Sequence, residues 1–302
     1  MLKFIIDRFA NKRGVNDADV DFEVSGLKIT LPSGHDLPTF QKDFPLYDAL
    51  LGHLAKFLPD RHLVIDVGAN VGDTVAAMSQ SNPLLSYLCI EADDYFFEYL
   101  EKNVSLIKTN CRDVHIQTHK TLVGVDVQAS SLSGGSRTKT VVTTDNSDVA
   151  IPTTKVDSIY ADLANETPLA LLKVDVDGYD YDVINSAIET LRNSNSYIYF
   201  ECDLQSSDGL KHYGKTLNKL HELGYTYFSV FDNFGYPMTL TQSVDVVSKL
   251  IEYAYIQKMG SSHKTIYYLD ILCFRHNLMD NYEEMMKSYI RLIEVSCNTS
   301  RS

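Results

Sequence analysis

The chain has 302 residues, 44% of them hydrophobic and 22% charged, and a formal net charge of −13. These values fit a globular protein with one large domain or two small ones and a full hydrophobic core. The excess of acidic residues repels phosphate groups, so we expect no nucleic-acid partner.

The cysteines indicate a protein of a reducing compartment. There are five, an odd number, and none stands in a CxxC pair, which argues against a disulfide framework and a cysteine-rich zinc site. We therefore expect a cytoplasmic protein. Asp7 interrupts the first apolar run too early for a signal peptide. No stretch approaches the roughly 18 apolar residues of a membrane span, so we expect no stable membrane insertion.

Residues 1–60 are expected to form an N-terminal extension. Apolar residues alternate with polar ones over 20–31, which predicts a small hairpin. Leucines at helical spacing over 45–58 predict a helix that ends before Pro59.

Strands and helices alternate after this extension. Short apolar runs, typical of buried parallel strands, are separated by segments with helical periodicity. This order predicts an α/β fold: a Rossmann-like, mostly parallel sheet of seven strands with helices on both faces. Residues 126–150, rich in Ser, Thr, Gly and Asp, are expected to form a long loop or a weak hairpin. The strands are expected at 63–67, 87–90, 114–118, 169–174, 197–200, 225–231 and 266–274, and the helices at 72–81, 94–103, 179–192 and 209–223.

A glycine loop follows the first of these strands. It reads Asp66-Val67-Gly68-Ala69-Asn70-Val71-Gly72-Asp73-Thr74 and opens a helix. Gly68 permits a tight turn and Gly72 a close approach, so backbone N–H groups and the positive helix end are expected to face an anionic or polar ligand group. The pattern lacks the third glycine of dinucleotide-binding loops, which indicates a single nucleoside. The alternative is a plain strand-to-helix turn.

An acidic residue ends the next strand. Glu91, followed by Ala92, stands 25 positions after Asp66. In nucleotide-binding α/β folds an acid about 20 residues beyond the loop accepts hydrogen bonds from ribose hydroxyls. The glycine loop and Glu91 together favour a nucleoside-binding site. The alternative, that Glu91 is only a surface residue at a strand end, is disfavoured.

A third cluster ends the fourth strand. Lys173, Asp175 and Asp177 share one side of an extended chain, and strand ends of this kind face the ligand crevice. Asp180 and Asp182 are expected to support the start of the following helix. The run differs from a calcium-binding EF-hand loop because its glycine comes too early.

Taken in order, these stretches resemble the FkbM family of methyltransferases. The family's Asp-Val-Gly-Ala-Asn-x-Gly stands at 66–72, and its strand ending in Glu-Pro is matched by Glu91 and Ala92. Its Lys-x-Asp-x-Glu-Gly-x-Glu is matched at 173–180, with Asp in place of both Glu residues. A further strand that ends in Glu is matched at Glu201. The resemblance covers about residues 60–235.

The resemblance implies a class I methyltransferase fold with S-adenosylmethionine as methyl donor. The expected methyltransferase domain covers 61–280, with an insertion near 232–262 indicated by the order of the elements, and a C-terminal helix and tail are expected at 281–302. The expected acceptor is a hydroxyl group of a sugar, glycan or natural product. The residues expected to bind the donor are Asp66, Gly68, Ala69, Asn70, Gly72, Asp73, Thr74, Glu91 and Ala92.

The resemblance also implies how the acidic cluster serves the reaction. A carboxylate beside the acceptor can take the hydroxyl proton; Asp175 is the first candidate and Asp177 the second. Glu201 is expected to bind the acceptor or to orient Lys173. For Lys173, a buried pair with a carboxylate is an equal alternative. Together with Asp203 these acids also offer oxygen ligands for magnesium, but we favour no metal.

Three alternatives remain at the level of sequence. A nicotinamide-dependent oxidoreductase is disfavoured by the missing third glycine of the loop. A noncatalytic nucleoside-binding protein of the same fold is favoured only by the two Asp-for-Glu replacements. A methyltransferase acting on protein or RNA is a variant of the main hypothesis, and the net charge of −13 disfavours RNA. The oligomeric state does not follow from the sequence.

Overall fold

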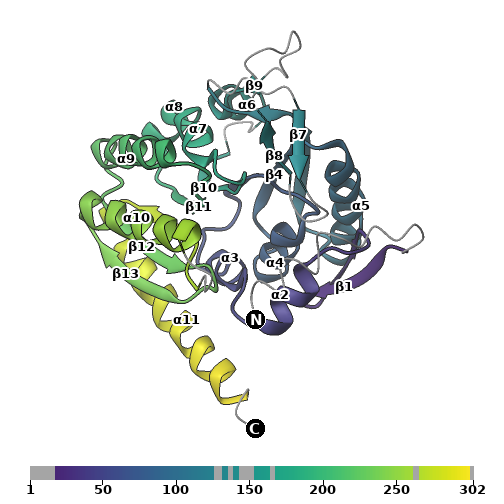
Figure 1. Cartoon of the computed structure of the whole chain (residues 1–302). Coiled ribbons are helices and arrows are strands. Elements are labelled where there is room, and N and C mark those ends of the chain that lie inside the picture. The colour runs from purple at the N-terminus through teal and green to yellow at the C-terminus, as the bar shows by residue number, and fades with distance from the viewer. Residues whose placement is uncertain are drawn as a thin grey trace.

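A twisted sheet flanked by helices forms the centre of the computed structural model, which describes residues 18–125, 131–134, 139–142, 153–163, 167–260 and 265–299 (Figure 1). Among these residues the main sheet has eight strands. In spatial order they are β13 (Pro237–Thr241), β12 (Tyr227–Asp232), β14 (Leu269–Phe274), β11 (Tyr197–Cys202), β10 (Leu169–Val174), β3 (Leu63–Val67), β4 (Ser86–Glu91) and β5 (His115–Lys120).

The directions of the strands confirm the predicted, mostly parallel α/β sheet. β5, β4, β3, β10 and β11 are parallel, whereas β14 runs antiparallel to both β11 and β12. The predicted number of strands was wrong: the seven expected strands are joined by β13, which pairs antiparallel with β12 at the edge of the sheet. Pro237, which cannot donate a ladder hydrogen bond, is tolerated there because it begins an edge strand.

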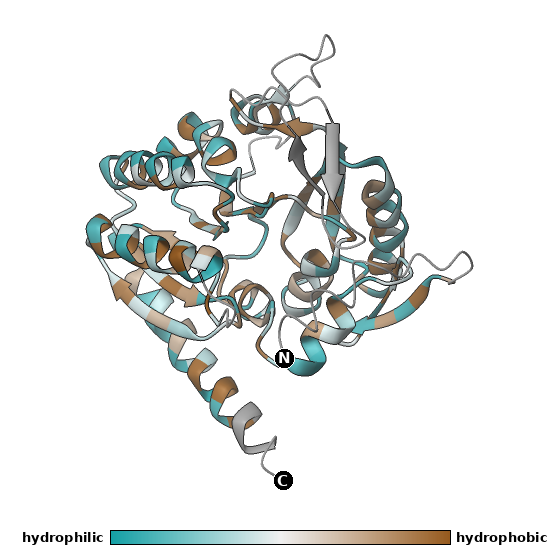
Figure 2. Cartoon of the chain, in the orientation of Figure 1, coloured by the Kyte–Doolittle hydropathy of each residue, from teal (hydrophilic) through white to brown (hydrophobic). Residues whose placement is uncertain are grey.

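Each face of the sheet has its own hydrophobic core. One core is built with helices α3 (Ala49–Ala55), α4 (Asp73–Ser81), α5 (Asp94–Asn110) and α11 (Met279–Thr299). The other is built with α6 (Val156–Leu163), α7 (Asp180–Asn185), α8 (Ile188–Arg192), α9 (Ser207–Glu222) and α10 (Val244–Gly260). Hydrophilic and hydrophobic residues alternate along the turns of the helices (Figure 2). This pattern is typical of helices that bury one face and expose the other.

The N-terminal elements lie against the first of these cores. The predicted hairpin is present as β1 (Val20–Val24) and β2 (Leu27–Leu31). Helix α2 (Leu37–Asp43) was not predicted, and the helix expected over 45–58 is limited to α3. Residues 1–17, which include the first apolar run, lie outside the described residues.

Two other differences from the prediction concern the helix expected over 179–192 and the segment 126–150. The helix expected over 179–192 is divided into α7 and α8 at Ser186, whose hydroxyl donates to the carbonyl of Val183 and accepts from the amide of Val156. That contact also marks the start of α6, which was not predicted. Within 126–150 the described part forms a hairpin of β7 (Ser131–Gly134) and β8 (Lys139–Val142), and the rest lies outside the described residues. None of the described helices is both long and apolar enough to cross a bilayer.

Candidate active site

The predicted glycine loop meets the loop after β10 at the carboxyl edge of the sheet. The amides of Gly68 and Ala69 both donate to the carbonyl of Ile90, at 2.9 and 3.0 Å. Gly68 has φ +79°, and a Cβ added there would lie 1.8 Å from the carbonyl oxygen of Asp175. Only glycine fits this position, because the two loops touch through their backbones.

Glu91 holds the glycine loop in place. One of its carboxylate oxygens accepts from the amide of Asn70 at 2.9 Å, and the other accepts from the amide of Asp93 at 2.8 Å. Burial raises the pKa of Glu91, and these two hydrogen bonds oppose that rise. Glu91 and the neighbouring Ala92 are both half-buried.

The loop amides do not face a ligand as expected. Besides the three amides already named, the amide of Val71 donates to the side chain of Asn70, and that of Gly72 donates to the carbonyl of Ala69. The N–H groups of residues 68–72 are thus already hydrogen-bonded within the protein, whereas the loop amides were expected from the sequence to face a ligand. The loop residues that line the crevice are Gly68, Asn70, Asp73 and Thr74, the last two in the first turn of α4.

Lys173 forms a buried ion pair beneath the loop. Its Nζ lies 2.9 Å from Oδ1 of Asp66 and 3.5 Å from Oδ2 of Asp175, and it donates to the carbonyl of Gly68 at 3.0 Å. The side chains of Lys173 and Asp66 are 3% and 0% exposed, whereas that of Asp175 is 46% exposed. Burial alone would lower the pKa of Lys173, but the carboxylates of Asp66 and Asp175 outweigh it and raise that pKa. Lys173 thus forms the buried pair that was one of its two expected roles, and it links the glycine loop to Asp175.

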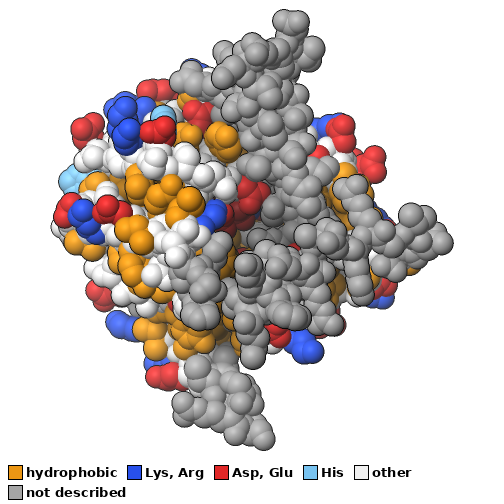
Figure 3. All heavy atoms as spheres, in the orientation of Figure 1, with side chains coloured by type: hydrophobic (Ala, Val, Ile, Leu, Met, Phe, Trp, Pro, Cys, Tyr) orange, Lys and Arg blue, Asp and Glu red, His pale blue; other side chains and the backbone are white. Residues whose placement is uncertain are grey.

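A cavity at this edge brings most of the predicted residues together. Acidic side chains gather near the middle of the face shown in Figure 3. A larger cavity, about 510 Å³, lies at the opposite edge, where β10 and β11 begin. The predicted residues that line the carboxyl-edge cavity are Gly68, Asn70, Asp73, Thr74, Lys173, Asp175, Asp177 and Glu201. Those that do not line it are Asp66, Ala69, Gly72, Glu91 and Ala92.

The structure adds an acid that the sequence did not reveal. Asp270 of β14 lines the cavity and lies directly opposite Glu201 of β11 in the antiparallel register. Burial and the neighbouring carboxylate of Asp175 raise the pKa of Asp270 to about 8, against the effect of a hydrogen bond from Tyr199. Burial, with Asp175 and Asp203, also raises the pKa of Glu201. The only sequence signal was an aspartate inside an apolar strand.

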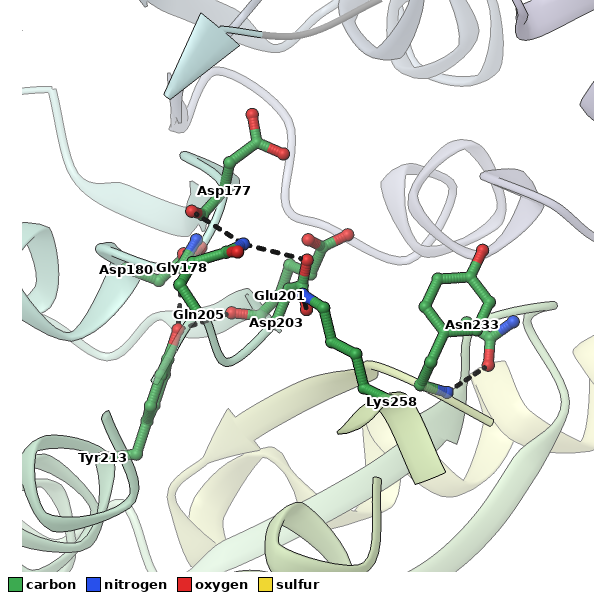
Figure 4. A network of polar contacts seen from close by, with 10 residues as sticks. Asp177, Gly178, Asp180, Glu201, Asp203, Gln205, Tyr213, Asn233 and Lys258 are labelled. Carbon is green, nitrogen blue, oxygen red and sulfur yellow. Dashed lines mark hydrogen bonds and ion pairs between the residues drawn. The ribbon is translucent and has the colours of Figure 1, made fainter. Parts of the chain in front are cut away.

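The residues after β10 and β11 are tied together and to α10 (Figure 4). The side-chain amide of Gln205 donates to the carbonyl of Asp177 and to the carboxylate of Asp203. Lys258 of α10 forms an ion pair with Asp203. The segment expected as an insertion thus contacts the loop that follows β11.

Asp180 and Asp182 hold the start of α7 and do not line the cavity. Asp180 is fully buried, and its carboxylate accepts from the amide of Gly178 and the hydroxyl of Tyr213. Asp182 accepts from the amide of Val125 at 2.7 Å. These three contacts are structural. Within the described ranges, no three His, Cys, Asp or Glu side chains are arranged to hold a metal ion.

Comparison with known proteins identifies the class. The family model for the methyltransferase FkbM domain matches residues 66–227, from the glycine loop to the start of β12. The chain belongs to the FkbM methyltransferase family. This membership confirms the resemblance seen in the sequence, the class I methyltransferase fold and S-adenosylmethionine as the donor of the class. No curated protein shows significant similarity to the sequence.

Solved structures include several similar methyltransferases. A precorrin-6y C5,15-methyltransferase from Geobacter metallireducens GS-15 shares 14% identity with a TM-score of 0.39, over 76% of this chain and 86% of that one. A methyltransferase FkbM from Methylobacillus flagellatus KT shares 15% identity with a TM-score of 0.41, over 57% of this chain and 40% of that one. The plantazolicin methyltransferase BpumL, in complex with SAH, shares 11% identity with a TM-score of 0.41, over 79% of this chain and 88% of that one.

Proposed function

We propose that this FkbM family member transfers the methyl group of S-adenosylmethionine to a hydroxyl oxygen of a sugar, glycan or other small molecule. The observation that carries the proposal is the cavity at the carboxyl edge of the sheet, which joins the glycine loop to the ends of β10 and β11. In open α/β sheets this edge is where ligands bind. S-adenosylmethionine, when bound, supplies an activated methyl group on a positively charged sulfur.

The charge of the side chains that line the cavity is complementary to that of S-adenosylmethionine. Six carboxylates line the cavity, against a single lysine that is already paired with Asp66 and Asp175. The donor carries a sulfonium and an ammonium group, so it is attracted to this lining. Burial raises the pKa of Asp73, although the nearby charge of Lys173 opposes this rise. We assign Asp73 and Thr74 to the methionine end of the donor and Glu91 to its ribose. The six carboxylates are Asp48, Asp73, Asp175, Asp177, Glu201 and Asp270.

The acceptor side is formed by the ends of β10 and β11. Asp175 is half-exposed at the cavity and fixed by Lys173, so it is placed to accept a hydrogen bond from an acceptor hydroxyl. Such a contact aligns the oxygen with the methyl carbon, which is the main task of an enzyme whose donor is already activated. The acidic lining repels phosphate groups, which disfavours RNA as acceptor.

The proposal is tested with methyl-labelled S-adenosylmethionine and three groups of acceptors: neutral sugars, peptides and RNA. We expect label on neutral hydroxyl compounds, recovered as base-stable methyl ethers. In the variant Asp175→Ala, label transfer should be lost while donor affinity changes little. Transfer only to peptide or RNA would replace the proposed acceptor class. Donor binding without transfer to any acceptor would favour the noncatalytic alternative.

A further inference from the structure

Two carboxylates face each other across β11 and β14. Glu201 and Asp270 are direct partners in the antiparallel register, so their side chains leave the same face of the sheet within about 5 Å of each other at Cβ. Both line the cavity, beside Asp175 and Lys173. Figure 4 shows Glu201 at the level of Asp203, above the end of α10.

Neither member of this pair has a cation of its own. In the part of the chain that the structure describes, Glu201 and Asp270 form no ion pair, whereas Asp175 contacts Lys173 and Asp203 contacts Lys258. The hydroxyl of Tyr199, on the strand next to Asp270, hydrogen-bonds to Asp270. Two adjacent carboxylates without a counter-ion cannot both ionise easily, and they retain a proton that one carboxylate alone would lose.

The surroundings of the pair are mostly acidic. A positive ligand placed among these groups favours the fully ionised pair, whereas an uncharged ligand does not. The groups that face the pair are Lys173, Asp175 and Asp177 of β10 and its loop, Tyr199 and Asp203 of β11 and its loop, Tyr268 of β14, Asp232 of β12, Asp48 before α3 and Tyr289 of α11.

We propose that Asp270, acting with Glu201, is the residue that takes the proton of the acceptor hydroxyl. This role rests on the proposed O-methyl transfer. The arriving sulfonium favours the fully ionised pair. The acceptor oxygen then forms the bond to the methyl carbon, and the sulfur–carbon bond breaks with its electron pair left on sulfur. The hydroxyl proton passes to the pair and leaves later to water.

This assignment differs from the one based on sequence. Asp175 was the first candidate for the base, but its carboxylate is held by the ammonium of Lys173. A base works best when its proton affinity matches the working pH, which suits two neighbouring carboxylates without a cation better than one that is already paired. Asp175 keeps the role of binding the acceptor, and Asp270 receives the proton.

The experiment counts protons on donor binding and needs no acceptor. S-adenosylmethionine and S-adenosylhomocysteine are titrated by calorimetry into the full chain at about pH 7.5, in two buffers that differ in ionisation enthalpy. We expect the sulfonium compound to release more protons than the uncharged thioether. The difference should vanish in Asp270→Asn and in Glu201→Gln. It should persist in Glu283→Gln, an exposed carboxylate of α11.

Equal proton release by both compounds in the natural chain would overturn the proposal, and so would a difference that persists in Asp270→Asn. Absence of binding by either compound would instead mean that the proposed function is wrong. If the variants fail to fold, an NMR titration of the natural chain with ¹³C-labelled carboxyl groups tests the proposal instead. A carboxyl group that titrates above about pH 6 by NMR is expected in the S-adenosylhomocysteine complex, and its absence would contradict the pair.

Discussion

The backbone amide of Asn70 donates a hydrogen bond of 2.9 Å to the carboxylate of Glu91, and this contact joins the glycine loop to the end of β4. Because Glu91 both shapes the loop and is assigned to the ribose, Glu91→Ala should weaken the binding of S-adenosylhomocysteine by about 1–3 kcal/mol, or roughly 5- to 150-fold. Calorimetric titration measures this change. The matched variant Glu98→Ala, on the exposed side of α5, should bind normally. Unchanged affinity in Glu91→Ala would remove Glu91 from the donor site.

Gly68 is expected to be irreplaceable. In Gly68→Ala the new Cβ would meet the carbonyl oxygen of Asp175 at 1.8 Å, and the positive φ alone costs about 1–2 kcal/mol for any other residue. We expect a lower melting temperature and loss of donor binding. Gly214→Ala is the control: nothing lies within 4 Å of its added Cβ inside α9, so it should stabilise the chain by about 0.5–1 kcal/mol. A Gly68→Ala variant as stable as the natural chain would show that the two loops do not touch.

The Lys173–Asp66 pair should matter for stability as well as for the site. Lys173→Met leaves the buried carboxylate of Asp66 without its cation, which should cost about 3–5 kcal/mol of unfolding free energy. Denaturant unfolding measures the loss. Adding Asp66→Asn to this variant should recover much of it. Lys102→Met, which removes an exposed ion pair with Asp19, should cost less than about 1 kcal/mol. A loss in Lys173→Met no larger than in this control would contradict the buried pair.

Asp270 should make stability depend on pH. Its pKa is raised in the folded chain to about 8 from 3.8, so the folded state holds a proton that the unfolded state has lost. Stability therefore falls as pH rises through this window. The fall in melting temperature between about pH 5 and pH 8 should be smaller in Asp270→Asn than in the natural chain. An identical fall in both would mean that Asp270 titrates normally.

The elements that depend on short stretches of consecutive residues could be predicted from the sequence. Four of the five parallel strands, β3, β4, β10 and β11, were predicted because each contains a short apolar run. The glycine loop was also found from local pattern, because its residues are consecutive; they begin the range that the family model matches.

Features that depend on contacts between distant segments could not be predicted from the sequence. Asp270 is brought opposite Glu201 only by the antiparallel insertion of β14 between β11 and β12, which no local pattern reveals. The break between α7 and α8 depends on the contact of Ser186 with Val156. The internal use of the loop amides depends on where Glu91 ends its strand.

The central claim is that the glycine loop and Glu91 bind the donor of a methyltransferase. Calorimetric titration of the purified chain with S-adenosylhomocysteine, with NAD as the parallel control, tests it most directly. We predict micromolar binding of S-adenosylhomocysteine and no binding of NAD. Folded protein that binds neither compound, or that binds only NAD, would contradict the donor site.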